Sequence, residues 1–441
     1  MGFQISMTTT TTNPEKYDLI VYGATGFTGM RIVQEITAFP PLKNLRWIIA
    51  GRDAKKLDLL VSTLDFSSVS RPAVMVADVK DAASLESCIG KARVCISCVG
   101  PFRLFGEPVV QACIKTATDY VDICGETEFI EKMYANYNQQ AIAQEIAIIP
   151  ACGYDCVPAD LGTLYTKMQF EKSNATASAI EMFVKFNSGK AGIAGNATTF
   201  ISAILGFASV SELRAIRKKS HRSVPYVGQP LKLSKGPRWE PRQAAWAIPA
   251  SVADVPIVKL GQQMVENHID TYKAGYRCGS YKPRQLAPVY FAGYFCFASY
   301  LSVLYFSYLG FILSLGARFQ WFRNWMISHP DMASLGIFKS NGPSQKQLNE
   351  SSFAMTFIGR GTTQQGSNLE IRTTVKGPEM GYVATPILVA GCASMLLDRE
   401  VRKYVPHGVL TPAAAFNCAA ETIIRKLDSR GVHFAVSSKL E

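Results

Sequence analysis

Short apolar runs alternate with stretches of helical spacing through the first third of the chain. The run 17–22 (YDLIVY) ends at the glycine-rich turn GATGFTG, and the MRIVQEITAF that follows has the apolar spacing of a helix. Five further apolar runs follow in order: LRWIIAGRD, AVMVADV, RVCISCVG, TDYVDICGE and IAIIPACG. Because parallel strands need crossovers that cover both faces, the pattern predicts an α/β fold with a Rossmann-type, doubly wound parallel sheet.

The pattern changes from about residue 177. The runs AIEMFVKFN, FAMTFIGRG and LEIRTTVKG predict a second sheet that is at least partly antiparallel. Near the C-terminus, Pro412 in a first turn and Gly431 past a last turn bound a predicted helix. We therefore expect four parts: a disordered leader at 1–16, a Rossmann domain at 17–158, an inserted α+β substrate domain at 159–384, and C-terminal helices at 385–441 that return to the Rossmann domain.

The inserted domain contains a hydrophobic segment, residues 285–317, that lacks any charged side chain. Spanning a bilayer takes about 20 apolar residues, so length does not exclude a spanning helix. One crossing would, however, separate two halves of one fold. We expect instead a re-entrant hairpin with a bend near Gly310, or a helix lying in a monolayer. A buried core helix or an oligomer interface, such as that of a homodimer, is the alternative.

Composition limits the possible partners. The chain has 441 residues, 18% of them charged, and a formal net charge of +12, which favours anionic partners. Zinc-finger spacing, arginine-rich tracts and RNP-like aromatic runs are absent from the sequence, so nucleic acid is not expected. A basic cluster is either a solvated face or a contact with anionic headgroups. Its members are Arg214, Arg217, Lys218, Lys219 and Arg222.

The cysteines indicate no metal centre. Eleven of them are scattered through apolar runs, which is typical of reduced, intracellular thiols. Cys95 and Cys98 form a CxxC, but side chains three apart on a strand point to opposite faces. No metal site is therefore predicted.

The turn GATGFTG is the first candidate site. Gly23, Gly26 and Gly29 follow a strand and open a helix, which is the context that a dinucleotide pyrophosphate needs. A purely structural tight turn is the alternative. The residues of this turn expected to bind the cofactor are Gly23, Thr25, Gly26, Phe27, Thr28 and Gly29.

The ends of the next strands suggest which cofactor binds. Arg52 follows the second strand where a 2′-phosphate would lie, and Lys55 is near, so NADP(H) is favoured over NAD(H). Asp53 complicates this choice, because it could bind the ribose hydroxyls of NAD instead. Asp78 and Val79 are expected at the adenine end, although Asp78 could instead cap the next helix.

The fourth strand ends in CVGPF. Ligands of open parallel sheets lie beyond the carboxyl ends of the strands, so Val99, Gly100 and Pro101 are expected beside the nicotinamide. The alternative is an ordinary turn.

Several motifs together resemble the saccharopine dehydrogenase-like oxidoreductases, a family whose bacterial relatives include trans-acting enoyl reductases of lipid synthesis. The motifs are GATGFTG, AGRD, CVGPF, YVDICGE, ACGYDCVPADLG and GVLTPAAAF. The resemblance implies a Rossmann domain with an inserted α/β domain, and in animals an association with lipid droplets.

The resemblance also suggests catalytic candidates. ACGYDCVPADLG is similar to the family's GFDSVPxDLG, with Tyr154 in place of phenylalanine and Cys156 in place of serine. Asp155 could position the substrate or a proton donor, and Tyr154 could supply the proton. Alternatively, Asp155 caps the next helix. Tyr382 and Thr385 match family positions at the seam between the domains and could line the cleft there, with Tyr382 as a further catalytic candidate; simple packing is the other explanation.

These features predict an NADP(H)-dependent oxidoreductase that reduces a C=C or C=O bond of a hydrophobic, lipid-linked substrate. It would act at a lipid droplet or on the cytoplasmic face of a membrane, and a mitochondrial site is less favoured because the leader lacks arginine. A non-catalytic droplet or membrane scaffold is one alternative, because no Tyr-xxx-Lys pair follows Tyr134 or Tyr137. A soluble amino-acid dehydrogenase is the other.

Overall fold

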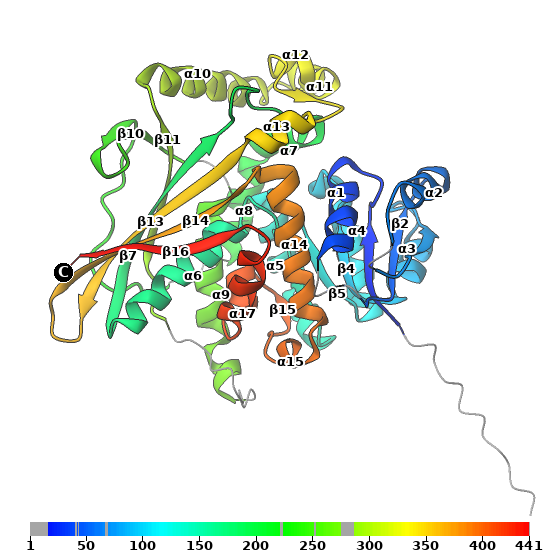
Figure 1. Cartoon of the computed structure of the whole chain (residues 1–441), viewed down its shortest axis with the longest axis horizontal. Coiled ribbons are helices and arrows are strands. Elements are labelled where there is room, and N and C mark those ends of the chain that lie inside the picture. Colours follow the sequence, from blue (N-terminus) through cyan, green and yellow to red (C-terminus); the bar gives the residue numbers. More distant parts are fainter. Residues whose placement is uncertain are drawn as a thin grey trace, which may run out of the picture.

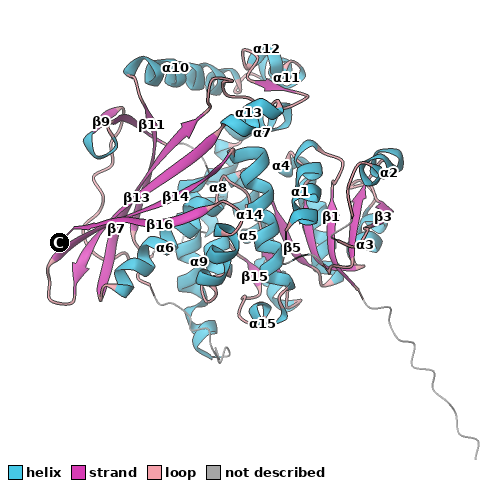
Figure 2. Cartoon of the chain, viewed as in Figure 1, coloured by secondary structure: helices cyan, strands magenta, loops and turns pink. Residues whose placement is uncertain are grey.

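The computed structural model describes residues 16–39, 42, 44–66, 69–220, 224–250, 253–274 and 286–440. The predicted leader lies outside these ranges except for Lys16, and so do Arg222 of the basic cluster and Gln285 at the start of the hydrophobic segment. Two seven-stranded sheets stand side by side with helices packed between them (Figure 1, Figure 2).

The first sheet is entirely parallel, with the strand order β3-β2-β1-β4-β5-β6-β15. Its strands are β1 (Tyr17–Tyr22), β2 (Trp47–Gly51), β3 (Ala73–Val76), β4 (Ala92–Ser97), β5 (Asp119–Asp122), β6 (Ala147–Ile149) and β15 (Gly408–Val409). The helices after the first five strands are α1 (Phe27–Ala38), α2 (Ala54–Ser62), α3 (Ala82–Ile89), α4 (Phe102–Thr116) and α5 (Thr127–Ala143). This confirms the Rossmann-type sheet. The strand order reverses between β1 and β4, the point at which such sheets bind ligands.

The continuous apolar runs explain why these strands are central. All five residues of β2 are buried, as are Leu19, Ile20 and Val21 of β1. Strands covered by helices on both faces lose the alternation of a half-exposed sheet. β3, at the edge, exposes Val76 instead.

The second sheet is mixed, with the order β16-β14-β13-β7-β11-β10-β9. Its strands are β7 (Ala175–Asn187), β9 (Arg238–Glu240), β10 (Ala245–Pro249), β11 (Tyr290–Phe297), β13 (Ser352–Thr363), β14 (Asn368–Pro378) and β16 (His433–Leu440). Only the β7–β11 pair is parallel. Two helices between the sheets, α6 (Val157–Lys172) and α9 (Asp254–Ala274), cover the inner face, and α6 approaches β13 closely because Gly162 leaves room for the ring of Phe357.

The C-terminal part divides between the two sheets. Helix α14 (Thr385–Leu397) contacts α1, β4 and β5, and β15 joins β6. The short helices α15 (Arg399–Arg402) and α16 (Pro412–Ala415) and then α17 (Ala420–Asp428) follow. The last strand, β16, pairs with β14 in the second sheet, whereas helices alone were expected after residue 385. The physical reason is that β16 is a mostly exposed edge strand, which is held by its backbone ladder and has no apolar run to reveal it.

The hydrophobic segment does not form one continuous helix. Its first part is β11, a strand paired on both sides by β7 and β10, and its second part is α10 (Tyr300–Gly316). The bend expected near Gly310 is wrong, because α10 runs through that residue, and the chain turns by 117° between α10 and α11 (Gln320–Ser328). Gly310 has open space around its Cα, so nothing forces a break there.

Helices α10, α11 and α12 (Pro330–Ala333) form what we call the apolar cap, at the top of Figure 1. The cap rests on α7 (Ala197–Ala208), where Ile204, Ala317 and Met326 form a small separate core. The remaining elements near it are β8 (Gly195–Asn196), α8 (Val210–Ser220), β12 (Phe338–Lys339) and α13 (Gln345–Glu350).

Length and composition alone would let one described helix, 380–397, cross a membrane, and two bent helix pairs would qualify if each counted as one span. That single helix includes α14, which is buried between the sheets. The bent pairs are α7 with α8 and α10 with α11.

Candidate functional site

The glycine turn between β1 and α1 is closed on its inner side and open on its outer side. Gly23 has a φ of +84°, and a Cβ there would lie 2.7 Å from Val99. A Cβ at Gly29 would collide with the carbonyl oxygen of Gly23. Gly26, in contrast, is exposed and begins α1 without a side-chain cap. The first amides of α1 are therefore free to bind an anionic phosphate group.

The side chains of this turn have separate roles. Thr25 and Thr28 are half-buried beside the open amides. The ring of Phe27 lies edge-on to that of Tyr382, 4.9 Å between centroids, and against Gly342, whose hydrogen leaves room for it. The ring of Phe27 thus joins the turn to the second domain.

At the ends of β2 and β3, Arg52 and Lys55 are exposed. The carboxylate of Asp53 accepts a hydrogen bond of 3.1 Å from the Lys56 amide and caps α2. This carboxylate is consequently engaged in the protein, which leaves the position after β2 to the positive charge of Arg52.

Asp78 lies just after β3 and near Tyr22. Burial and the charge of Asp78 raise the pKa of Tyr22, whereas Arg52 lowers it, so both charges lie near that phenol. Asp78 is half-buried, like Val79, and accepts from the Lys80 amide at 3.0 Å. The cap of α3 is Asp81 rather than Asp78, so the helix-capping alternative for Asp78 is wrong.

The loop after β4 reaches the second domain. Val99 and Gly100 are half-buried and Pro101 is buried, with a cis peptide bond between the last two. A Cβ at Gly100 would lie 3.8 Å from the methyl group of Thr198, at the start of α7. The predicted nicotinamide end is therefore bordered by α7.

The N-terminus of α4 is already occupied by a protein carboxylate. Glu126 accepts hydrogen bonds from the amides of Phe102 at 2.8 Å and Arg103 at 3.0 Å, and from the Ser202 hydroxyl at 2.9 Å. Of the helix starts after β1 and β4, only that of α1 is left for an external anion. Glu126 was not a sequence candidate, although YVDICGE was among the motifs.

After β6, Tyr154 and Asp155 occupy different environments. Tyr154 is buried, and its hydroxyl has no hydrogen-bond partner among the described residues. Asp155 keeps an exposed surface beside Gly125, but protein surrounds it on the other sides, and this desolvation raises its pKa. Neither residue caps α6, because the cap position is Cys156 and no side-chain cap is formed. The capping alternative for Asp155 is therefore wrong.

Asp254, at the start of α9, interacts electrostatically with both of these residues. It is buried, and its Oδ1 has no hydrogen-bond partner within the described ranges. Burial and the nearby Asp155 and Asp160 raise its pKa well above the ordinary value. Burial raises the pKa of Tyr154, and the charge of Asp254 raises it further. In all three groups burial favours the neutral form. Sequence reasoning missed Asp254 because an acid in a first helical turn is usually structural.

Tyr382 links the two domains through hydrogen bonds. Its hydroxyl accepts a hydrogen bond of 2.6 Å from the Asn196 amide and lies 3.2 Å from the Thr199 hydroxyl. The Thr385 hydroxyl accepts from the Tyr154 amide at 3.0 Å. Both residues lie at the seam, as expected, and their hydroxyls are engaged in holding α7 and the β6 turn together.

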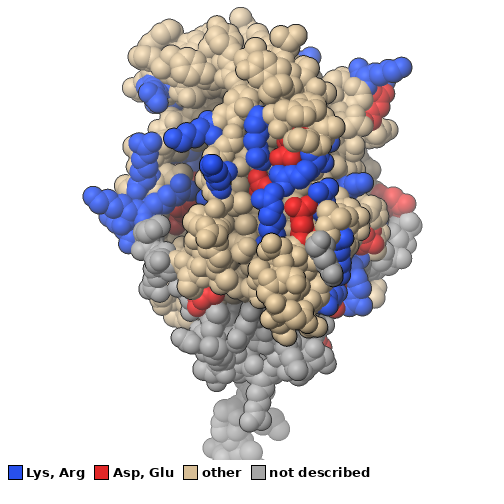
Figure 3. Space-filling view, turned by 90° about the vertical axis from the view of Figure 1, so that its left-hand side faces the viewer, with Lys and Arg blue, Asp and Glu red and all other residues tan. Residues whose placement is uncertain are grey.

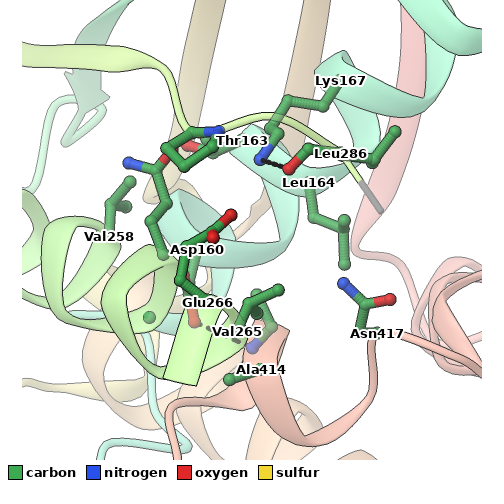
Figure 4. Close-up of a pocket in the computed structure, with 14 residues that line it drawn as sticks. Asp160, Thr163, Leu164, Lys167, Val258, Val265, Glu266, Leu286, Ala414 and Asn417 are labelled. Atoms are coloured by element: carbon green, nitrogen blue, oxygen red, sulfur yellow. Dashed lines mark hydrogen bonds between the residues drawn. The ribbon is translucent and has the colours of Figure 1, made fainter. Parts of the chain in front are cut away.

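Figure 4 shows a separate pocket between α6, α9 and α16. The Lys167 ammonium donates to the carbonyl oxygen of Leu286 at 3.1 Å, and desolvation lowers its pKa to about 8. Asp160 accepts from the Ala413 amide at 2.8 Å, and burial raises its pKa to about 6. No residue of the first five βα turns lines this pocket, so it is a seam between helices rather than part of the cofactor edge.

Known proteins similar to this chain extend over its whole length. Residues 19–149 match the family model described as the saccharopine dehydrogenase NADP binding domain. A rat saccharopine dehydrogenase-like oxidoreductase is 34% identical over 446 residues, covering 98% of this chain and 99% of its own. A Caenorhabditis elegans protein named lipid droplet localized protein is 33% identical, covering 97% and 99%. The structure of a Saccharomyces cerevisiae saccharopine dehydrogenase (L-Glu forming) shares the fold, with a TM-score of 0.52 at 13% identity, over 96% of this chain and 100% of its own.

Two further relatives bear on particular expectations. A trans-acting enoyl reductase of Mycobacterium leprae is 36% identical over 151 residues, 34% of this chain and 35% of its own. An Arabidopsis thaliana relative, 32% identical over 98% of this chain and 99% of its own, carries the name "probable mitochondrial saccharopine dehydrogenase-like oxidoreductase". The named locations of the relatives therefore differ.

Proposed function

Because this chain belongs to the saccharopine dehydrogenase-like oxidoreductase family, we propose that it uses NADPH to reduce a C=C or C=O bond of a hydrophobic, lipid-linked substrate at a lipid surface. The observation that carries the proposal is the combination of an open glycine turn and an exposed apolar cap in one molecule. α7 connects the two, since its first residues border Gly100 and Tyr382 and its later residues support the cap.

The residues around the glycine turn fit a dinucleotide. The amides at the start of α1 would bind the pyrophosphate, and Gly26 leaves space for it. Arg52 and Lys55 favour NADPH over NADH, because both are exposed where the 2′-phosphate would lie, and Asp53 is engaged in capping α2. Bound NADPH would supply the hydride.

The proton must come from the protein or from water. Asp155 is better suited than Tyr154, because its carboxyl is accessible and desolvation raises its pKa, whereas the Tyr154 hydroxyl is buried. In the reduction, one end of the substrate double bond receives the hydride and the other receives the proton of Asp155. Asp254 would then act through these neighbours by keeping the local charge low.

The cap supports binding to a lipid surface. Leu301, Tyr308 and Phe311 of α10 are 76%, 66% and 64% exposed, and such an area is far more apolar than ordinary protein surface. Figure 3 shows the top of the molecule almost free of charged side chains, with Lys and Arg gathered below it. A helix of 17 residues followed by a sharp turn suits a monolayer better than a crossing. We therefore propose a lipid droplet or the cytoplasmic face of a membrane as its location.

A scaffold without catalysis is the second candidate. It is favoured by the hydroxyls of Tyr154 and Tyr382, of which one is buried and the other engaged in hydrogen bonds. A scaffold would bind nucleotide without oxidising it in the presence of any lipid.

Substitution at Gly26 tests the proposal. Gly26→Asp and Gly26→Asn would both cap α1 about equally well, so both should fold, but only the aspartate places a negative charge at the pyrophosphate site. We expect NADPH oxidation with lipid extract to fall to background in Gly26→Asp and to fall less in Gly26→Asn. NADH should be the poorer cofactor of the wild type.

Equal oxidation rates in the wild type and Gly26→Asp would refute cofactor binding at this turn. Wild-type protein that binds NADPH but oxidises none with any lipid fraction would favour the scaffold.

A further inference from the structure

The two faces of the second sheet differ in the chemistry of their aromatic residues. On the outer face, Phe183 of β7 and Tyr294 of β11 stack at 5.3 Å, and the guanidinium of Arg238 lies 4.7 Å from the ring of Tyr294. On the inner face, Phe186 of β7 lies 5.7 Å from Phe295 of β11, and Phe297 points to the same side as Phe295 because side chains alternate along a strand. The inner face carries aromatic rings without these charges.

Helix α6 leaves part of this inner face uncovered. α6 covers the sheet at Phe357, and Phe353 is only 3% exposed. Beyond the start of α6, however, Phe186 is 39% exposed and Phe295 and Phe297 are half-buried. We call Phe186, Phe295 and Phe297 the aromatic wall.

The aromatic wall connects the two parts of the proposed function. At one end, the ring of Tyr154 lies 6.4 Å from that of Phe186. At the other end, Phe297 stacks on Phe306 of α10 at 5.2 Å. The wall therefore leads from the apolar cap to the cluster of Tyr154, Asp155 and Asp254.

A hollow beside the wall adds further apolar surface. Phe186, Ile193, Pro343 and Met380 line it, together with polar groups that include Glu379. At the catalytic end, Asp155 offers an accessible carboxyl, and behind it two buried polar atoms, the Tyr154 hydroxyl and Asp254 Oδ1, lack partners among the described residues. Buried polar groups are normally hydrogen-bonded, so this end suits the polar part of a ligand.

We infer that the aromatic wall binds the hydrocarbon chain of a fatty-acyl substrate, with its carbonyl end at the Tyr154 cluster and its chain directed toward the cap. The inference rests on the proposed function and names the substrate class. A flexible hydrocarbon chain suits the wall because rings and methylene groups exclude water together without needing hydrogen bonds. The substrate can then enter from a lipid surface without leaving apolar surroundings.

Photolabelling of the full chain tests the inference. A diazirine analogue of palmitic acid is irradiated with the protein, and the labelled peptides are identified by mass spectrometry. We expect labels in the peptides that contain Phe186, Ile193 and 295–297. In Phe186→Ser/Phe297→Ser, labelling of these peptides should fall at least about tenfold, since each change removes most of a ring's apolar area.

Matched variants keep the test decisive. Phe186→Leu retains apolar area and should label nearly as the wild type does, and Leu59→Ser on the exposed face of α2, away from the wall and the cap, should leave wall labelling unchanged. Labels confined to 300–316, or equal wall labelling in the double serine variant, would overturn the inference. NADPH affinity is measured on the same samples. A wild type that does not bind NADPH contradicts the proposed function. A wild type that binds NADPH but carries no label on the wall contradicts only the assignment of the wall.

Discussion

Helices α14 and α10 are both apolar and free of charged side chains, yet they lie in opposite environments. In α14, every residue from Thr385 to Leu396 is buried. In α10, only Val303 and Gly316 are buried. One helix is at the centre of the fold, between the two sheets, and the other presents an exposed apolar surface.

Side-chain size distinguishes the two helices. α14 is rich in small residues, and Gly391 brings it so close to α17 that a Cβ would lie 2.7 Å from Leu427. α10 carries aromatic residues on several sides, and Gly310 has nothing within 4 Å of an added Cβ. Small residues permit close contact of helices, whereas large exposed rings and leucines mark a surface for an apolar partner.

A charge introduced into each helix should give the largest difference between them in the free energy of unfolding. Leu388 in α14 is fully buried, so Leu388→Asp should lower the free energy of unfolding by more than about 4 kcal/mol or prevent folding. Leu301 in α10 is 76% exposed, so Leu301→Asp should change it by less than about 0.5 kcal/mol. Denaturant unfolding measures both.

Lipid binding provides a second test of the Leu301→Asp variant. Flotation with phospholipid-coated triolein droplets should show weaker binding of Leu301→Asp than of the wild type, at unchanged stability. A Leu301→Asp protein that floats as the wild type does would contradict the assignment of α10 as the lipid-binding surface.

Added volume should have a smaller effect. Gly391→Leu should cost about 1–3 kcal/mol of stability through overpacking against Leu427. Gly310→Leu should instead add up to about 1 kcal/mol, because leucine favours a helix more than glycine does and meets no neighbour. Thermal unfolding of the two variants provides the comparison, and equal shifts in the same direction would mean that the helices do not differ in packing.

The smallest difference expected is in pH dependence. α10 has no carboxylate, so droplet binding through it should not follow carboxyl titration. Turnover depends on the turn after β6, which α14 contacts through Thr385 and in which desolvation raises the pKa of Asp155. Because the protonated form donates, turnover should be highest below this raised pKa and fall by up to about tenfold per pH unit above it.

The control for the pH profile is Asp155→Asn, which should lower turnover and remove this decline while leaving NADPH binding intact. A decline that persists in Asp155→Asn would assign the titrating acid to another group, with Asp254 as the next candidate.

The first sheet could be predicted because its strands are buried on both faces. Runs such as WIIAG need no partner information to be recognised, and the glycines of GATGFTG specify the turn by sterics. The edge strand β16 could not be predicted in this way, because backbone pairing rather than apolar burial holds it.

The parts of the candidate site that the local backbone conformation determines could be predicted from the sequence. The parts that depend on contacts between distant segments could be predicted less well. Gly26 and Arg52 are exposed at the predicted edge, and these cofactor contacts remain predictions. The engagement of Tyr382 with Asn196, the contact of Phe27 with Gly342, and the burial of Asp254 each depend on residues distant in sequence. The hydrophobic segment likewise divides into β11 and α10 because β7 offers its first part a partner, which hydropathy alone cannot show.

The most direct test of the account is transfer of deuterium from NADPH labelled at nicotinamide C4, with both stereoisomers used in turn. Full-length protein bound to droplets made from lipid extract is incubated with each isomer, and the lipids are analysed by mass spectrometry. The account predicts deuterium in a lipid product with one isomer in the wild type, and none with either isomer in Gly26→Asp. Deuterium absent from every lipid in the wild type, although NADPH binds, would contradict it.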